Sequence, residues 1–476
     1  MTDQIFEKTS RIGASAQDLY AWHSRPGAFL RLSPPWQQVR LLAGSTGLRE
    51  GSRVVLELKS GPFRKIWKAE HRNVRPGLGF QDIQLEGPFD RWEHTHDFSP
   101  LDATSSKLRD RISYRLPAGT LGDLAGRNFV RHQLERVFAY RHRTTAEDLR
   151  LFARFRDLPR LKIAVTGCTG FIGSAFAHLL TTQGHTVLPM ARATSVQNPN
   201  LVTWNTEDGV LNPQSLEGVD AVVHLAGESV SEGRWSHTKK NRIRTSREKG
   251  TARLVASLLE LNEPPKTLVS ASAIGFYGNR QDKILNEHSS RGSGFLAEIA
   301  DAWESASQVA SKAGIRVVNP RLGVVLSPTG GALAKMLPLF QIGAGGVLGS
   351  GRQWVSWISL DDAISALLQT IMSPDLRGPV NVTAPKPVDN QDLTKVLAKV
   401  VRRPAFARVP SLAARVAFGE MAEEMLLAST RVMPECLADD GFEFRHPELE
   451  TALRHVLGRT ALSTGSTRAT AEQDPR

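Results

Sequence analysis

The stretch Lys162-Ile-Ala-Val-Thr-Gly167-Cys-Thr-Gly170-Phe-Ile-Gly173 decides the fold of this chain. It sets three glycines at three-residue spacing between a short apolar run and a helical segment, which predicts a strand, a turn and a helix. Gly167 permits the tight turn, Gly170 lets the backbone approach a pyrophosphate, and Gly173 lets helix and strand pack closely. The amides at the helix N-terminus would then face the phosphates of a dinucleotide.

A second signal lies about fifty residues further along the chain. His224-Leu-Ala-Gly227 ends another buried strand, and its small residues let the backbone pass close to an adenine ribose. The two signals together make a chance glycine-rich turn a poor explanation. We therefore expect a dinucleotide site formed by Gly167, Thr169, Gly170, Phe171, Ile172, Gly173, Leu225, Ala226 and Gly227.

The residue after the second strand indicates which dinucleotide is bound. An NAD site usually carries a carboxylate there, about 20 residues beyond the glycines. This chain has Met190-Ala-Arg192 instead, with no acidic residue before Glu207. A guanidinium suits a 2′-phosphate, so Arg192 favours NADP(H), the alternative being an arginine that only faces solvent.

Strands and helical segments alternate after Leu161, which predicts an α/β fold with a doubly wound parallel Rossmann sheet. The buried strands are expected at 162–166, 186–190, 201–204, 221–225, 267–271 and 316–321. Helices centred near Phe176, Arg253, Trp303 and Leu367 separate or follow them. From about Arg403 the chain turns helical, with an amphipathic helix over 412–427, and it closes with Phe442-Glu-Phe444 and Leu449–Leu457. The chain divides into 1–156, 161–402, 403–458 and a Ser/Thr/Ala-rich tail, 459–476, that is expected to be disordered.

The first 156 residues have a different order of elements. A strand at 5–10, a helix at 15–23, a meander of alternating runs and a long helix at 128–154 predict an α+β unit. This order resembles the helix-grip fold of the START-like (SRPBCC) superfamily, in which a sheet wraps the last helix around an apolar cavity. Phe89, Trp92 and Phe98 are then candidates to line a site for an apolar ligand, or else they only fill a core.

Composition excludes several classes of protein. Hydrophobic residues make up 41% and charged residues 23%, which is typical of a globular protein. No apolar run reaches the roughly 18 residues that span a bilayer, and the two cysteines form neither a disulfide framework nor a metal-ligand pattern. We expect a cytoplasmic protein without a metal. The net charge of +12 comes from scattered residues, so no nucleic-acid partner is expected.

Further strings resemble the atypical, extended short-chain dehydrogenase/reductases of the epimerase/dehydratase class, in the subgroup often labelled cell-division-inhibitor-like. They are Leu225-Ala-Gly-Glu228, Gly233-Arg-Trp235, Arg242-Ile-Arg-Thr-Ser-Arg247, Ser272-Ala-Ile-Gly-Phe-Tyr277-Gly278, Arg321-Leu-Gly-Val-Val-Leu326, Gly330-Gly-Ala-Leu-Ala-Lys-Met-Leu337 and Gly349-Ser-Gly-Arg-Gln-Trp354-Val-Ser-Trp357-Ile-Ser-Leu-Asp361-Asp362. The resemblance covers about 300 residues. It implies a small-molecule substrate and a small, mainly helical C-terminal domain of unknown function, and a homodimer is compatible with it.

The superfamily moves hydride with a Tyr-x-x-x-Lys pair, in which the lysine lowers the tyrosine pKa. The residues four positions after the four tyrosines of this chain are Ser24, Ala118, Thr144 and Gln281, so the pair is absent. Phe295 and Ile299 stand where the resemblance would place it. This departure puts ordinary carbonyl reduction in doubt.

Ser272 and Tyr277 follow a central strand, at the edge where open α/β sheets bind ligands, and are the candidate catalytic residues. Loop capping and packing are the alternative for both. Trp303 and Glu304 are expected to pack and cap. An anionic-substrate wall, as for a nucleotide sugar, is expected from Arg321, Lys335, Arg352 and Gln353. Two functions stay open: an NADP-dependent oxidoreductase or epimerase, and a catalytically idle NADP(H)-binding protein.

Overall fold

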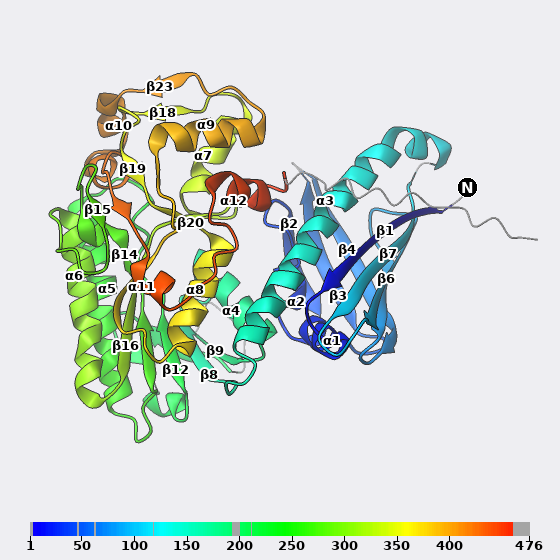
Figure 1. Cartoon of the computed structure of the whole chain (residues 1–476), viewed down its shortest axis with the longest axis horizontal. Helices are drawn as coiled ribbons and strands as arrows, with labels where there is room; N and C mark the ends of the chain where they lie inside the picture. The colour runs from blue at the N-terminus through cyan, green and yellow to red at the C-terminus, as the bar shows by residue number, and fades with distance from the viewer. Residues whose placement is uncertain are drawn as a thin grey trace, which may run out of the picture.

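The architecture was obtained as a computed structural model that describes residues 3–44, 47–60, 63–117, 119–192, 200–210 and 212–459. Apart from its first residue, Arg459, the tail predicted at 459–476 lies outside these ranges. Two sheet-containing units stand side by side, with the long helix α3 (Gly119–Arg154) between them (Figure 1).

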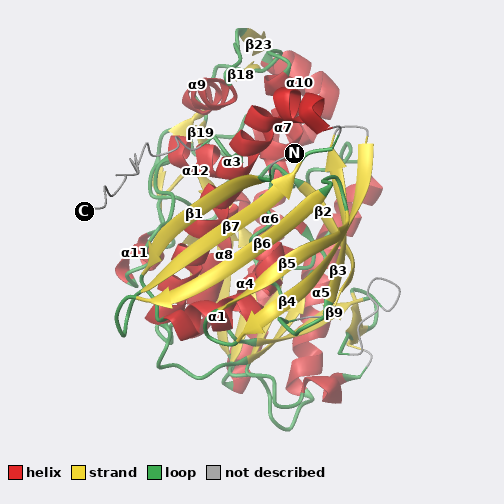
Figure 2. Ribbon diagram, turned by 90° about the vertical axis from the view of Figure 1, so that its right-hand side faces the viewer, coloured by secondary structure: helices red, strands yellow, loops and turns green. Residues whose placement is uncertain are grey.

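The N-terminal unit is built on one seven-stranded antiparallel sheet in the order β1-β7-β6-β5-β4-β3-β2 (Figure 2). Its strands are β1 (Gln4–Ile12), β2 (Gln38–Gly44), β3 (Arg53–Ser60), β4 (Phe63–Arg75), β5 (Gly79–Glu86), β6 (Arg91–Pro100) and β7 (Ser106–Arg115). Helices α1 (Ala16–Ser24) and α2 (Ala28–Arg31) connect β1 to β2. The sheet curves around α3, so the predicted α+β helix-grip arrangement is confirmed.

Alternation of side chains gives this sheet its inner face. Along β6, buried Trp92, His94, His96 and Phe98 alternate with more exposed residues, as expected for a strand covered on one side. Helix α3 packs on this face with Leu134 and Phe138, which contact a cluster of sheet residues formed by Phe6, Trp92 and Ile112.

The second unit holds a sheet whose main strands run parallel in the order β10-β9-β8-β12-β13-β16-β21, the doubly wound arrangement that was predicted. These strands are β8 (Lys162–Thr166), β9 (Thr186–Ala191), β10 (Val202–Asn205), β12 (Ala221–His224), β13 (Thr267–Ser270), β16 (Arg316–Leu322) and β21 (Gly378–Val382). Short β11 (Gly209–Val210) and β14 (Ser272–Ala273) extend it. The helices are α4 (Phe171–Thr182), α5 (His237–Leu259), α6 (Phe295–Gln308) and α8 (Leu360–Met372).

Both faces of this parallel sheet are covered, which explains why its strands are apolar without alternation. Val165, Val223 and Val269 pack on the side of α4 and α8. Their neighbours Val222 and Leu268 pack on the opposite side, with α5.

The other described elements, most of which follow β16 in the chain, form four small two-stranded sheets and several helices. The strand pairs are β15 (Ile284–Leu285) with β24 (Arg431–Val432), β17 (Val324–Leu326) with β20 (Trp357–Ser359), β18 (Gly346–Leu348) with β23 (Ala407–Val409) and β19 (Trp354–Val355) with β22 (Val388–Asp389). The helices are α7 (Gly331–Gln341), α9 (Asn390–Val401), α10 (Ser411–Phe418), α11 (Glu435–Asp439) and α12 (Leu449–Val456).

The predicted single helix over 412–427 is wrong. Helix α10 ends at Phe418 because Gly419 adopts φ +62°, and a separate π-helical turn follows over Ala422–Leu426.

A buried ionic network joins the two units. The guanidinium of Arg31 donates to both oxygens of Asp148, at 3.0 and 2.8 Å, and to Asp361 at 2.8 Å. Arg445 donates to Asp148 at 2.8 Å, and His455 lies 3.1 Å from Asp361. Burial alone would raise the pKa of Asp361, but Arg31 and His455 outweigh it and hold the pKa well below its usual range.

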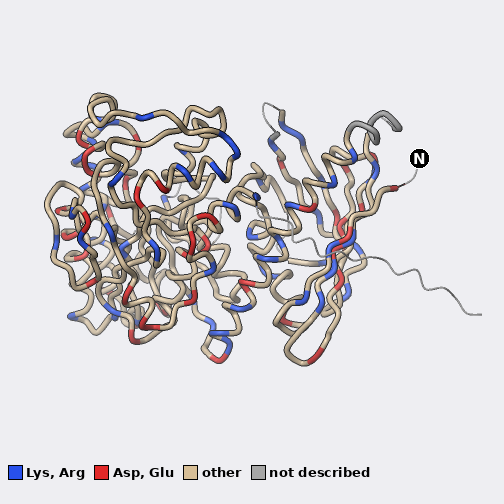
Figure 3. The backbone as a smooth tube through the Cα atoms, turned by 45° about the horizontal axis from the view of Figure 1, so that its top comes forward, with Lys and Arg blue, Asp and Glu red and all other residues tan. Residues whose placement is uncertain are grey.

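Lys, Arg, Asp and Glu are interspersed along both units (Figure 3). Among the described residues, no helix is long and apolar enough to cross a bilayer.

The buried network generates a stability prediction. Asp148→Asn leaves Arg31 and Arg445 without their shared carboxylate, and breaking a buried pair from one side costs about 3–5 kcal/mol of unfolding free energy. Denaturant unfolding followed by circular dichroism measures the loss. The matched control is Asp375→Asn at an exposed position, expected to stay within about 0.5 kcal/mol of the parent. Equal stability of the two variants would contradict the importance of the network.

Candidate functional site

The turn between β8 and α4 has the geometry of a phosphate-binding loop. Gly167 has φ +70°, which its tight turn requires, and the amide of Gly170 donates to the Gly167 carbonyl at 2.9 Å. A Cβ added to Gly173 would lie 2.1 Å from the same carbonyl oxygen, so any side chain there would push helix and strand apart. Helix α4 starts directly after Gly170 with no side chain bonded to its first amides, which leaves them available to an anion.

The end of β12 closes on this loop, bringing the two predicted halves of the dinucleotide site together. The Thr166 hydroxyl accepts the amides of Leu225 and Ala226, at 3.1 and 3.2 Å. A Cβ on Gly167 would lie 3.0 Å from the amide nitrogen of Ala226. Thr169 is exposed in the loop, whereas Phe171 and Ile172 are half-buried in the first turn of α4.

Arg192 directly follows β9 and is exposed. Strand β9 lies beside β8 with Met190 opposite Thr166, so Arg192 stands at the same carboxyl edge as the loop. Its predicted role in binding a 2′-phosphate stays a prediction. Residues 193–199, which follow it, lie outside the described residues.

Ser272 and Tyr277 belong to a buried polar network that includes two residues not predicted as part of the site. Ser272 Oγ donates to Glu304 Oε1 at 2.6 Å. Arg321 holds the same carboxylate with two bonds, at 2.8 and 2.7 Å, and donates to the Tyr277 hydroxyl at 2.9 Å. That hydroxyl donates in turn to Asn381 Oδ1 at 2.7 Å.

Tyr277 is 0% exposed, and its ring lies beside the Arg321 guanidinium. Burial raises the pKa of Tyr277 to about 12, although Arg321 acts in the opposite direction. A hydroxyl with this pKa and two partners already in place is poorly suited to exchange protons near neutral pH. These contacts favour the packing alternative for Tyr277.

Glu304 is one residue of this network that the sequence analysis did not predict as part of the site, because it assigned Glu304 to packing and capping. It follows buried Trp303 and lies three residues before buried Ser307, on the inward side of α6. A carboxylate on the inward side of a helix needs a buried partner, and that signal could have directed attention to Arg321.

The four residues of the predicted anionic-substrate wall differ in their partners and exposure, and their role stays a prediction. Arg321 is committed to Glu304, and the buried Gln353 amide donates to the carbonyls of Leu348 and Leu426. Lys335 on α7 bonds the Ser231 carbonyl, while Arg352 is exposed. Within the described part of the chain, no hydrogen bond or ion pair joins any two of the four.

The N-terminal sheet encloses a cavity of about 1550 Å³ against α3 and α7. Trp67, Phe89 and Trp92 line it, whereas Phe98, also predicted there, is packed in the core at 1% exposure. Residues of the second unit complete its wall, including Thr329, Leu337 and Pro338. The space is large enough for a lipid-sized molecule.

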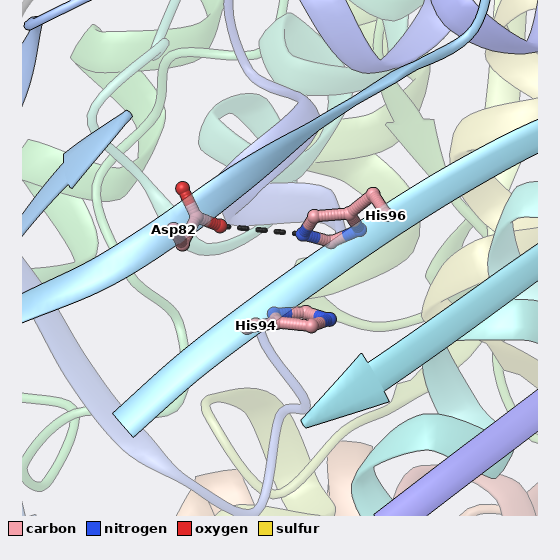
Figure 4. Close-up of side chains that lie close together, drawn as sticks. All are labelled: Asp82, His94 and His96. Carbon is pink, nitrogen blue, oxygen red and sulfur yellow. Dashed lines mark hydrogen bonds and ion pairs between the residues drawn. The ribbon is translucent and has the colours of Figure 1, made fainter. Parts of the chain in front are cut away.

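One part of this cavity is polar. Asp82 on β5 and His94 and His96 on β6 line it. Figure 4 shows that these three side chains lie close together. Burial alone would lower the pKa of His96, but Asp110 and Asp82 outweigh it and raise the pKa to about 9. The sequence analysis missed this cluster; the His94-x-His96 spacing, which puts both rings on one face of a strand, was the available signal.

Comparison with known proteins follows this division of the chain. Residues 163–383 match the NAD dependent epimerase/dehydratase family, 409–456 a domain of unknown function (DUF1731), and 12–138 the polyketide cyclase/dehydrase and lipid transport family. An epimerase family protein of Mycobacterium tuberculosis is 44% identical over 297 residues, which is 62% of this chain and 98% of that protein. One from Bacillus subtilis is 37% identical over 62% of this chain and 98% of its own length.

Two solved structures extend the likeness. The nucleoside-diphosphate sugar epimerase from Corynebacterium glutamicum has a TM-score of 0.78 at 33% identity, covering 96% of this chain and 91% of its own. Human epimerase family protein SDR39U1, solved with NADPH, has a TM-score of 0.58 at 30% identity, covering 63% of this chain and all of its own. This chain therefore belongs to the NAD-dependent epimerase/dehydratase family of short-chain dehydrogenase/reductases, as an epimerase family protein that carries an additional N-terminal polyketide cyclase-like unit.

Proposed function

We propose that this protein is an NADP(H)-dependent oxidoreductase or epimerase that acts on a small molecule. The loop from Gly167 to Gly173 is the observation that carries the proposal, because its glycines leave room that any side chain would fill. The first amides of α4 would hold the pyrophosphate, and Leu225–Gly227 would lie beside the adenine ribose. A bound nicotinamide would supply hydride transfer.

The preference for NADP(H) rests on Arg192. Its guanidinium stands at the carboxyl edge beside the loop, where it would pair with a 2′-phosphate. The human relative solved with NADPH supports the same choice.

Ser272 is the residue best placed to orient a substrate oxygen. Its hydroxyl proton is committed to Glu304, so its oxygen is left to accept a hydrogen bond. A substrate hydroxyl fits this arrangement better than a carbonyl, since only the hydroxyl can donate. A nucleotide sugar carries such hydroxyls, and the Corynebacterium glutamicum epimerase supports that substrate class.

A second candidate function is favoured by the burial of Tyr277 and of the residues at the Tyr-x-x-x-Lys position. Phe295 and Ile299 pack with Ile243 in a small apolar cluster. In this second proposal the protein binds NADP(H) without turnover, and its N-terminal unit binds an apolar ligand. The division into 1–156, 161–402 and 403–458, a homodimer, a cytoplasmic location and the lack of nucleic-acid binding stay predictions under either proposal.

The cofactor proposal is tested by nicotinamide fluorescence titrations with NADPH and NADH. Arg192→Ala removes a charge-assisted contact of about 1.5–3 kcal/mol, so it should erase roughly ten- to hundredfold of the preference for NADPH. Arg377→Ala, at another exposed arginine, is the matched control and should keep the preference. Equal affinity of the parent for both cofactors would contradict the proposal.

Tyr277→Phe separates the two roles of the tyrosine. The variant removes one buried hydrogen-bond partner from Arg321 and the partner of Asn381 Oδ1, so we expect a loss of about 1–3 kcal/mol in unfolding free energy with unchanged NADPH affinity. Single-turnover hydride transfer, once a substrate is found, should stay near the parent rate. A drop of about 10²–10⁴ in that rate would instead identify Tyr277 as the proton donor or acceptor.

The apolar-ligand proposal is tested on the full chain with N-phenyl-1-naphthylamine, a probe whose fluorescence rises in apolar surroundings. Ala69 lines the cavity, and Ala69→Trp should fill part of it and weaken binding at least about tenfold, or about 1.4 kcal/mol. Ala153→Trp on the exposed side of α3 should bind like the parent. If both variants bind the probe equally well, the probe binds outside this cavity.

A further inference from the structure

The polar part of the N-terminal cavity gathers three side chains that ligate metals. Asp82, His94 and His96 each offer one ligand atom, and these atoms lie within 4.8 Å of one another (Figure 4). Asp82 Oδ2 and His96 Nε2 are 3.2 Å apart. Asp82 and His94 are also directly paired across strands β5 and β6, so the sheet itself fixes their separation.

A second layer of residues orients both imidazoles. Asp110 Oδ1 lies 2.8 Å from His94 Nε2 and 2.6 Å from His96 Nδ1. Asp110 Oδ1 thus contacts one nitrogen of each ring, and the other nitrogen of His96 faces Asp82. Histidines that bind metals are typically held in this way by a carboxylate.

The supporting layer is itself held in place. His142 Nε2 lies 2.6 Å from Asp110 Oδ2, and its Nδ1 lies 2.9 Å from Ser10 Oγ. On the other side, His71 Nδ1 lies 2.5 Å from Asp82 Oδ1. Both carboxylates therefore have both oxygens engaged by rigid rings, so the ligand atoms are fixed in advance of any binding.

The surrounding charge also permits a cation. Among the described residues, no Lys or Arg forms an ion pair with Asp82 or Asp110. Arg141, which lines the same cavity, donates to the Leu32 carbonyl and acts on both carboxylates only from a longer distance. A second group of similar composition, Asp361 with His446 and His455, differs in this respect. There, the Arg31 guanidinium lies 2.8 Å from Asp361 and already neutralises the charge of this carboxylate.

We propose that Asp82, His94 and His96 bind one divalent first-row transition-metal ion, with an open coordination position facing the cavity. Two imidazoles and one carboxylate suit Zn²⁺ or Fe²⁺ better than Ca²⁺ or Mg²⁺, which prefer oxygen ligands. Three protein ligands leave room for water or a ligand atom. The molecule that the cavity takes is then an apolar one with an oxygen donor at one end, such as a carboxylate or a β-dicarbonyl group.

The test uses the untagged full chain, freed of metal with a chelator and titrated with Co²⁺. We expect one equivalent to bind, with visible d–d absorption of a low-coordinate ion, and Zn²⁺ to displace it. Asp82→Asn and His96→Gln should each weaken binding more than tenfold. Asp110→Asn should weaken it ten- to hundredfold, as for residues that support a metal ligand. His132→Gln, at an exposed histidine of α3, is the matched control and should bind like the parent.

Thermal unfolding and NADPH titration of each metal-free variant show whether it is folded, and these readouts do not depend on the metal. A parent that takes up no stoichiometric metal overturns the proposal. So does a folded Asp82→Asn or His96→Gln variant that still binds one equivalent with parent affinity. Neither result would bear on the cofactor proposal, which depends on the other unit.

Discussion

The contact between Arg31 and the carboxylates of Asp148 and Asp361 is the constraint on which the arrangement of the two units depends. Burying a guanidinium is costly unless its donors are bonded, and Arg31 has three bonds to carboxylate oxygens. These carboxylates come from α3 and from the first turn of α8, more than two hundred residues apart. Arg445 completes the charge balance, so the N-terminal unit, the Rossmann sheet and the C-terminal segment must meet at one point.

In this arrangement of the units, helix α7 lies between the cavity of the N-terminal unit and the dinucleotide loop. Its Leu337 and Pro338 line the cavity of the N-terminal unit. At its start, Gly330 lies so close to Phe171 of the dinucleotide loop that a Cβ there would be 2.5 Å from the ring. Helix α7 therefore borders the cavity of the N-terminal unit at one end and the dinucleotide loop of the Rossmann unit at the other.

The helices and strands with strong periodic patterns were predicted from the sequence, but few of the contacts between these elements were. Strands such as 162–166 and 186–190 are recognisable from local residues alone, because both faces of the sheet are apolar. Glu304 with Arg321, and His94 with Asp110, were missed because each pairing depends on a tertiary contact between different elements. The break of the helix at Gly419 was missed for a local reason, since the apolar spacing continues across it.

Buried carboxylates of this protein differ in the partner that neutralises them, and the difference decides what each can do. Asp148 and Glu304 are held by Arg31 and Arg321, whose charge is permanent, so these carboxylates serve the architecture. Asp82 and Asp110 are held by imidazoles, which can be neutral and then bind a cation through a ring nitrogen. The cluster of Asp82, His94 and His96 also lines the cavity of the N-terminal unit, and it is there that charge can be exchanged with a ligand.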